Sequence, residues 1–195
     1  MVSKVSKISL ATVLVIGSLS VTAGYQLPES PSEVVVVQEK VQEAPSKLYY
    51  DCPLDQSLQD HIMMLCDKNN IPTDLVLAVI EQESSFRQDV ISHNDYGLMQ
   101  INKINHGWLT EKYGITDFLD PYQNAFCGIT MLSGYYNKYQ DVDKALMAYN
   151  IGEYGARAMW TKGIVTTSYT EGVKAKRVKY ETPSVSEIPE VTTEY

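Results

Sequence analysis

The chain has 195 residues, of which 44% are hydrophobic, so it is long enough for one globular domain with a buried core and some unstructured sequence besides. Acidic residues outnumber basic ones by 24 to 16, which gives a formal net charge of -8. This balance argues against a nucleic-acid partner, and we expect a monomer.

Residues 1–23 have the layout of a secretory signal peptide. Lys4 and Lys7 precede an uncharged apolar run from residue 8 to residue 21, and small residues follow. We predict cleavage after Ala23 and an exported protein of the cell envelope or the extracellular space. The alternative is an uncleaved N-terminal membrane anchor, although the apolar run is shorter than the roughly 20 residues that span a membrane.

The segments on either side of the predicted domain have a different composition from it. Residues 24–50 are rich in Pro, Glu, Gln, Ser and Val without a helical period, which predicts a flexible linker. The run from Val34 to Val37 has no partner strand, so a tether is preferred to a strand there. Residues 181–195 are rich in Pro, Ser, Thr and Glu and are predicted to form a disordered tail, which leaves residues 51–180 as the domain.

The first half of the domain begins with two predicted helices. Apolar residues recur at helical spacing over residues 55–68. The next helix begins at Pro72 and ends near Ser85, and its six consecutive apolar residues make it a buried central helix. Residues 86–115 are rich in turn formers, with short helical pieces expected at 98–102 and 108–113.

The second half is also helical. Asp120 and Pro121 provide an N-cap and a first helical residue, and apolar residues follow at helical spacing. Asp143 is predicted to cap the next helix, which Gly152 interrupts, and a last helix covers residues 168–180. Because the domain contains no useful alternating apolar pattern, we predict an all-α fold.

The cysteines and histidines do not suggest a metal centre. Cys52, Cys66 and Cys127 permit at most one internal disulfide, and Cys66 and Cys127 are expected on apolar helix faces. The three histidines are scattered without ligand spacing, so we expect no metal and no other cofactor.

Glu83 is the strongest candidate for acid–base chemistry. It lies three residues after Ile80 and four after Val79, which puts its carboxyl on an apolar face at the C-terminal end of the central helix. Desolvation there would raise its pKa toward neutral pH, as a glycosidic general acid requires. Glu81 is expected to point elsewhere and to be solvated. On periodicity alone, a Glu83 carboxylate turned to solvent remains an equal alternative.

Three sequence blocks change that balance. They are Glu-Ser-Ser-Phe at 83–86, Tyr-Gly-Leu-Met-Gln-Ile at 96–101 and Ala-Tyr-Asn-Ile-Gly at 148–152. In this order they resemble the catalytic domain of the soluble lytic transglycosylase family, and the resemblance extends over residues 54–179. It implies a lysozyme-like all-α fold with a glycan-binding groove.

The resemblance also implies roles for particular residues. Glu83 would be the sole catalytic carboxyl, with Tyr149 hydrogen-bonded near it. The implied substrate-binding residues are Ser84, Gly97, Leu98, Met99, Gln100 and Asn150. Met99 and Gln100 would touch sugar, although Met99 alternatively fills the core, and Asn150 would chiefly organise its loop.

The implied activity is non-hydrolytic cleavage of the β-1,4 bond between N-acetylmuramic acid and N-acetylglucosamine in peptidoglycan glycan strands, which leaves 1,6-anhydromuramic ends. One alternative is a goose-type lysozyme-like hydrolase, for which Asp95 would be the nearby acidic residue that activates water. We expect Asp95 to be chiefly a turn residue. The other alternative is a catalytically silent glycan-binding module.

Overall fold

The computed structural model describes residues 48–183. The predicted signal segment, most of the predicted linker and most of the predicted tail lie outside these residues. Tyr50, the last residue assigned to the linker, is tied to the first helix. Its backbone N–H donates to Gln59 Oε1 at 2.9 Å, and Gln59 Nε2 donates to the Tyr50 carbonyl at 3.2 Å. Tyr50 therefore belongs to the folded part.

The described part of the chain is mostly helical, as predicted. Its α-helices are α1 (Gln56–Lys68), α2 (Thr73–Ser84), α3 (His106–Tyr113), α4 (Pro121–Tyr139), α5 (Val142–Trp160) and α6 (Ser168–Arg177), with 3-10 turns at η1 (Lys103–Asn105) and η2 (Val178–Tyr180). Gly152 interrupts α5 with a φ of 74°, which confirms the predicted break.

Aspartate caps account for several helix starts. Asp120 Oδ1 accepts the backbone N–H of Gln123 at 2.8 Å, as predicted for α4. The predicted cap of α5 is wrong, because Asp141 rather than Asp143 accepts the N–H of Lys144, at 3.0 Å. Both aspartates fit the capping pattern, but Asp143 already lies inside the helix and binds Lys174 of α6 instead.

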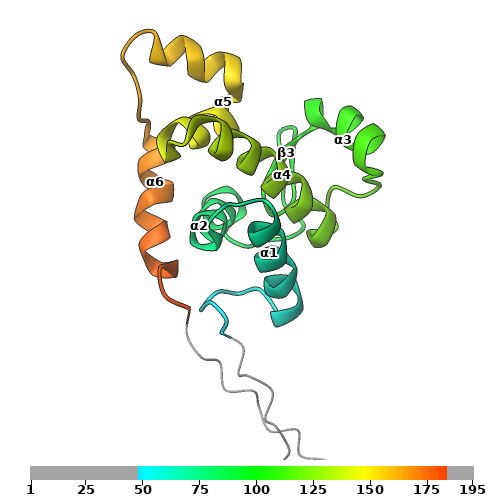
Figure 1. Cartoon of the computed structure of the whole chain (residues 1–195). Helices are drawn as coiled ribbons and strands as arrows, with labels where there is room; N and C mark the ends of the chain where they lie inside the picture. Colours follow the sequence, from blue (N-terminus) through cyan, green and yellow to red (C-terminus); the bar gives the residue numbers. More distant parts are fainter. Residues whose placement is uncertain (1–47, 184–195) are drawn as a thin grey trace, which may run out of the picture. The chain divides into compact units, whose positions relative to one another are not determined.

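Helix α2 lies at the centre of the described residues, with α6 packed along it and α1 against another side (Figure 1). The side chains of Leu75–Ile80 are at most 1% exposed, which confirms the predicted buried helix. Helices α4 and α5 pack against each other, and α4 also contacts α1. Cys66 and Cys127 are fully buried free thiols on α1 and α4, as expected of small apolar residues.

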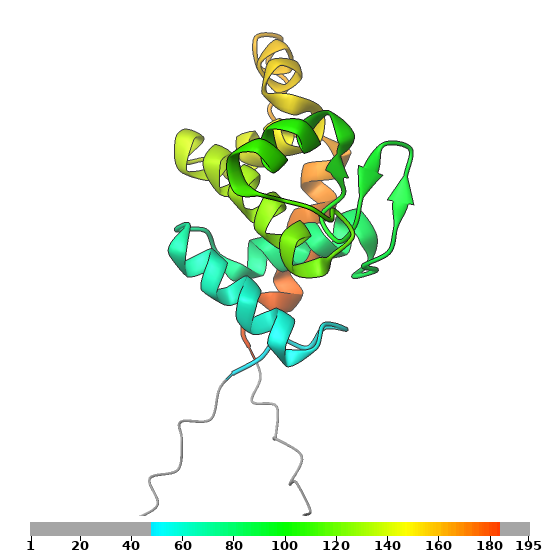
Figure 2. The same cartoon turned by 90° about the vertical axis from the view of Figure 1, so that its right-hand side faces the viewer.

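A small antiparallel sheet follows α2 (Figure 2). Its strands are β1 (Ile91–Ser92), β2 (Asp95–Tyr96) and β3 (Ile101–Asn102), and β2 is the middle strand. The sequence predicts no strand here and a helical piece over 98–102, and both expectations are wrong. Strands of two residues are too short to show an alternating pattern. The other expected piece is confirmed by α3.

The turn between β2 and β3 needs an unusual backbone. Gly97 has a φ of +72°, and a Cβ on it would lie 2.4 Å from Asn124 Nδ2. Gln100 also has a positive φ, of 49°, and its side-chain Nε2 donates to the Gly97 carbonyl at 2.8 Å. A helix cannot continue through two left-handed residues, so this segment forms a turn.

Asn124, in α4, holds this turn in place. Its amide is fully buried and makes three hydrogen bonds. Oδ1 accepts the N–H of Met99 at 2.8 Å, and Nδ2 donates to the carbonyls of Tyr96 and Phe118, each at 2.7 Å. Buried backbone groups without partners are costly, so this one side chain stabilises both the turn between β2 and β3 and the chain just before α4.

Replacing Asn124 with alanine is therefore expected to lower the free energy of unfolding by about 3 kcal/mol, because three buried backbone groups lose their partner. Urea denaturation followed by circular dichroism measures this. The matched control is Asn137→Ala, which removes one exposed hydrogen bond to the Asn69 carbonyl and should cost less than about 1 kcal/mol. Equal losses in the two variants would contradict the role given to Asn124.

Candidate active site

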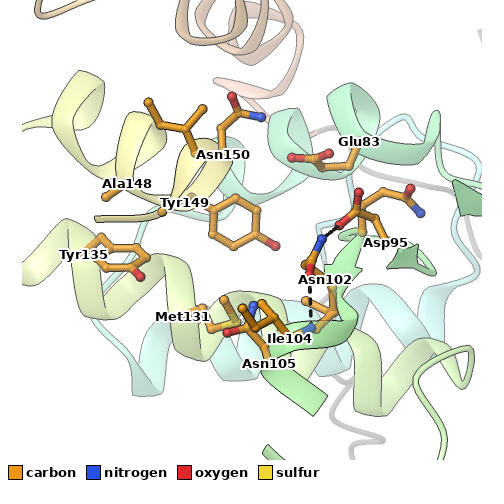
Figure 3. A pocket seen from close by; sticks show the side chains of 14 residues that line it. Glu83, Asp95, Asn102, Ile104, Asn105, Met131, Tyr135, Ala148, Tyr149 and Asn150 are labelled. Carbon is orange, nitrogen blue, oxygen red and sulfur yellow. Dashed lines mark hydrogen bonds between the residues drawn. The ribbon is translucent and has the colours of Figure 1, made fainter. Parts of the chain in front are cut away.

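A cavity of about 480 Å³ opens beside the C-terminal end of α2, a size typical of ligand sites (Figure 3). Its walls come from α2, the small sheet, η1, α4 and α5. The lining residues are Glu83, Asp95, Gln100, Ile101, Asn102, Ile104, Asn105, Met131, Tyr135, Ala148, Tyr149, Asn150, Ile151 and Gly152.

Glu83 is the acidic residue that α2 presents to this cavity. Burial raises the pKa of its carboxyl to about 7; a hydrogen bond from Tyr169 opposes this rise and the negative charge of Asp95 adds to it. The predicted desolvation of Glu83 and the rise of its pKa are confirmed. A carboxyl with this pKa is partly protonated at neutral pH and can both donate and accept a proton.

Glu81, two residues before Glu83 on α2, has a different environment. Its carboxylate accepts hydrogen bonds from Lys179 Nζ and from the Tyr180 hydroxyl, each at 2.6 Å. Burial alone would raise its pKa, but these two hydrogen bonds outweigh that effect and lower it. Glu81 does not line the cavity, which agrees with the prediction that it points elsewhere, and its partly exposed carboxylate is paired with Lys179 and Tyr180.

The end of α2 explains how Glu83 comes to face the cavity. Ser85 and Phe86 both adopt left-handed backbone conformations, with φ of 52° and 63°, and turn the chain sharply after the helix. Such residues cost on the order of 1 kcal/mol each and are frequent at functional sites. Ser84, an implied substrate-binding residue, is 2% exposed, and its hydroxyl donates to the Ile80 carbonyl. It supports the helix end rather than lining the cavity.

Tyr169, in α6, contacts Glu83 directly, and the sequence analysis did not single it out. Its hydroxyl donates to Glu83 Oε1 at 2.5 Å. Burial, with the adjacent Glu83 charge, raises the pKa of Tyr169 well above its usual range, so it stays a neutral donor. Only the capping residue Thr167 and the apolar spacing of α6 could have indicated that one face of this helix meets α2.

Tyr149 lines the cavity but does not bind Glu83. Its hydroxyl donates to the Met99 carbonyl at 2.7 Å, which joins α5 to the turn after β2. Burial, together with the charge of Glu83, raises its pKa well above the usual range. The implied hydrogen bond of Tyr149 thus stabilises the wall of the cavity, while Tyr169 takes the position next to the carboxyl.

The implied substrate-binding residues divide into two groups. Gln100 and Asn150 line the cavity. Gly97, Leu98 and Met99 are buried behind its wall. Met99 is fully buried against α4, where a Cβ on Gly128 would lie 2.3 Å from its sulfur, so its side chain fills the core.

Asp95 also lines the cavity, and it belongs to β2 rather than to a turn, so the expectation that it is chiefly a turn residue is wrong. It lies opposite Asn102 in the sheet, and Asn102 Nδ2 donates to Asp95 Oδ1 at 2.7 Å. Figure 3 shows its carboxylate between Glu83 and Asn102. The cavity therefore contains two carboxyl groups in different surroundings.

Within residues 48–183, no group of three or more His, Cys, Asp or Glu side chains is placed to hold a metal ion. None of the helices in the same part of the chain has the length and apolar character needed to cross a membrane.

The described residues thus form an all-α domain whose central helix presents a carboxyl to a polar cleft, which is the lysozyme-like arrangement that the three sequence blocks imply. The chain belongs to the Transglycosylase SLT domain family, whose sequence profile matches residues 60–163, more than half of its length. The family resemblance seen in the three sequence blocks is thereby confirmed.

Two curated relatives illustrate the similarity. The chain is 33% identical over 97 residues to membrane-bound lytic murein transglycosylase F of Desulfosudis oleivorans, a match that covers 46% of this chain and 20% of that protein. It is 35% identical over 91 residues to invasion protein IagB of Salmonella typhimurium, covering 43% of this chain and 56% of that protein. The matched region is thus about a fifth and somewhat over half of these relatives.

Solved structures support the same fold. The complex of the 70-kDa soluble lytic transglycosylase with bulgecin A superposes with a TM-score of 0.57 at 22% identity, over 73% of this chain and 27% of that one. An inactive mutant of lytic transglycosylase Slt from Pseudomonas aeruginosa gives a TM-score of 0.52 at 20% identity, over 66% and 23% of the two chains.

The Tyr169–Glu83 contact generates a prediction that does not depend on activity. The hydroxyl of Tyr169 favours the ionised form of Glu83, so in Tyr169→Phe the pKa of Glu83 should rise above its value of about 7. Carbon-13 NMR titration of the side-chain carboxyls measures the pKa of Glu83 in the wild type and in the variant. Tyr154→Phe, at a tyrosine that is 91% exposed, is the matched control and should leave the titration unchanged. An unchanged or lower pKa in Tyr169→Phe would refute the contact.

Proposed function

We propose that this protein is a peptidoglycan lytic transglycosylase that cleaves the β-1,4 bond between N-acetylmuramic acid and N-acetylglucosamine and leaves 1,6-anhydromuramic ends. The observation that carries the proposal is Glu83, a carboxyl with a pKa of about 7 in a cleft of suitable size. Membership of the SLT family and a relative named as a lytic murein transglycosylase support it.

In the proposed reaction Glu83 acts first as acid and then as base. The protonated carboxyl donates its proton to the bridging oxygen as the bond from C1 of the muramoyl sugar to that oxygen breaks. The N-acetyl group of the same sugar stabilises the positive charge at C1. The sugar's own 6-hydroxyl then attacks C1 and gives its proton to the Glu83 carboxylate, so the enzyme is restored and no water is consumed.

The other residues of the site would hold the substrate and the acid. Gln100, just before β3, and Asn150, in α5, are proposed to contact sugar, because both line the cavity with polar side chains. Tyr169 orients Glu83, and Tyr149 fixes the turn that carries Gln100 by binding the Met99 carbonyl. The four buried residues of the implied set would contribute only by supporting the cavity wall, namely Ser84, Gly97, Leu98 and Met99.

A hydrolase is the second candidate, and one observation favours it. Asp95 lines the same cavity as Glu83, so a carboxylate is available to activate a water molecule. Most glycosidases use two carboxyl groups, one as the acid and the other either to activate water or as the nucleophile. The two reactions differ in their products, because hydrolysis leaves a reducing sugar and transglycosylation leaves an anhydro sugar that is lighter by one water.

Digestion of purified peptidoglycan followed by mass spectrometry tests the proposal. We expect the wild-type protein to release anhydro-ended muropeptides, and Glu83→Gln to lose at least on the order of 10²-fold in rate, since the amide keeps the shape but cannot donate the proton. Glu81→Gln is the control on the same helix and should remain active. Reducing ends would point to the hydrolase, and no cleavage at all by the wild type would point to a glycan-binding module.

We also propose that the protein is exported to the cell envelope or beyond, where peptidoglycan lies. The charged start, the apolar run and the small residues of segment 1–23 support this. N-terminal sequencing of protein recovered from the expressing cells should give a mature chain that begins at or near Gly24. Full-length chain in the membrane fraction would instead indicate an N-terminal anchor.

A further inference from the structure

We propose that Asp95 is a second functional carboxylate of this site, whose negative charge stabilises the positive charge that develops at C1 of the cleaved sugar. This inference rests on the proposed glycan cleavage and adds to it a residue that the sequence analysis assigned chiefly to a turn. It is carried by the position of Asp95 in the cavity, by its pairing with Asn102 and by the charges of the cavity walls.

The sheet fixes the Asp95 side chain at the cavity. Asp95 pairs with Ser92 on one side and with Asn102 on the other, so its backbone is held in the middle strand. Asn102 Nδ2 then donates to Asp95 Oδ1 at 2.7 Å. This donor, drawn in Figure 3, orients one carboxylate oxygen of Asp95. Tyr169 does the same for Glu83. An amide donor is uncharged, so it orients the carboxylate without neutralising its charge.

The charge of Asp95 is not compensated within the cavity. Among the described residues that line it, the ionisable groups are Glu83 of α2, Asp95 of β2, and the tyrosines Tyr135 and Tyr149, with no lysine or arginine. Tyr169 of α6 does not line the cavity, and it contacts Glu83 as a neutral donor. A half-buried negative charge without a cationic partner creates a potential that favours positive charge in the same space.

Such a potential suits a glycosidic bond cleavage. The transition state has oxocarbenium character, so positive charge appears on the sugar where the substrate had none. A fixed negative group stabilises that state more than the ground state, which is the requirement for catalysis. In glycosidases, two carboxyl groups in different surroundings commonly take different roles, one as the acid and the other as a negative charge. Here Glu83 would act as the acid, and Asp95 would supply the fixed negative charge.

A structural role alone would not need the charge. Asparagine at position 95 could accept the same hydrogen bond from Asn102 and has nearly the same shape. The charge also acts on Glu83: burial is the main reason that the Glu83 pKa is raised, and the negative charge of Asp95 adds to the effect. Asp95→Asn therefore removes the charge while leaving the local geometry in place.

The test measures rate and pH dependence of muropeptide release by the full-length chain. Asp95→Asn should lose on the order of 10²-fold in rate, and the fall of activity at alkaline pH should move to lower pH, since Glu83 loses a neighbour that favours its protonated form. Tyr169→Phe should move the same limb the opposite way. Asp89→Asn, an exposed aspartate outside the cavity, is the matched control and should behave as wild type.

A second variant separates charge from geometry. Asn102→Ala keeps the Asp95 charge and removes only the donor, so it should lose less activity than Asp95→Asn and should not move the alkaline limb to lower pH. Wild-type rate and pH profile in Asp95→Asn, or equal rate losses in the two variants with the limb unmoved, would overturn the inference. Because Glu83→Gln is measured alongside, a failure of Asp95 alone is distinguishable from a failure of the proposed function.

Discussion

The carboxyl of Glu83 is kept partly protonated near pH 7 by its removal from water, and much of the surrounding fold serves that removal. Its helix is buried along residues 75–80, and two left-handed residues turn the chain away immediately after it. Desolvation raises the pKa, and the Tyr169 hydroxyl moderates the rise while fixing one oxygen. The same environment would disfavour a permanently ionised side chain at this position.

Helix α6 has to be held in register for Tyr169 to reach Glu83. Thr170 and Val173 are fully buried next to Tyr169, so apolar packing against α2 supplies most of the attachment. Arg177 binds Asp74 of α2 at 2.7 Å at the far end of the contact. Because ion pairs near the surface contribute only about 0–1 kcal/mol, this pair chiefly sets the register of the two helices.

The wall of the cavity that α5 forms depends on the break in this helix. Gly152 adopts φ 74° and ψ 152°, which lets Asn150 and Ile151 stand at the rim of the cavity while the chain continues as a second helical stretch. Glu153 ties that stretch to α4 by accepting hydrogen bonds from Tyr139 and Lys138, each at 2.5 Å. The chain is therefore anchored to α4 directly after the interruption.

The sequence by itself determined the all-α class, the buried central helix and the break at Gly152, because apolar spacing, caps and glycine are local signals. For Glu83, periodicity left a carboxylate turned to solvent equally open, and the tertiary structure decided that the carboxyl is desolvated. Membership of the family also followed from the sequence, because its three blocks are short and contiguous.

Tertiary structure decided which side chains meet across long separations. Tyr169 lies 86 residues from Glu83, and Asn124 lies 25 residues from the Met99 N–H that it binds, and no local pattern indicates either contact. The burial of Met99 and the exposure of Asp95 to the cavity depend on a turn and on two-residue strands too short to leave a periodic signal. Hydrogen bonds of this kind form only when distant segments pack together, whereas helical periodicity can be recognised within a single segment.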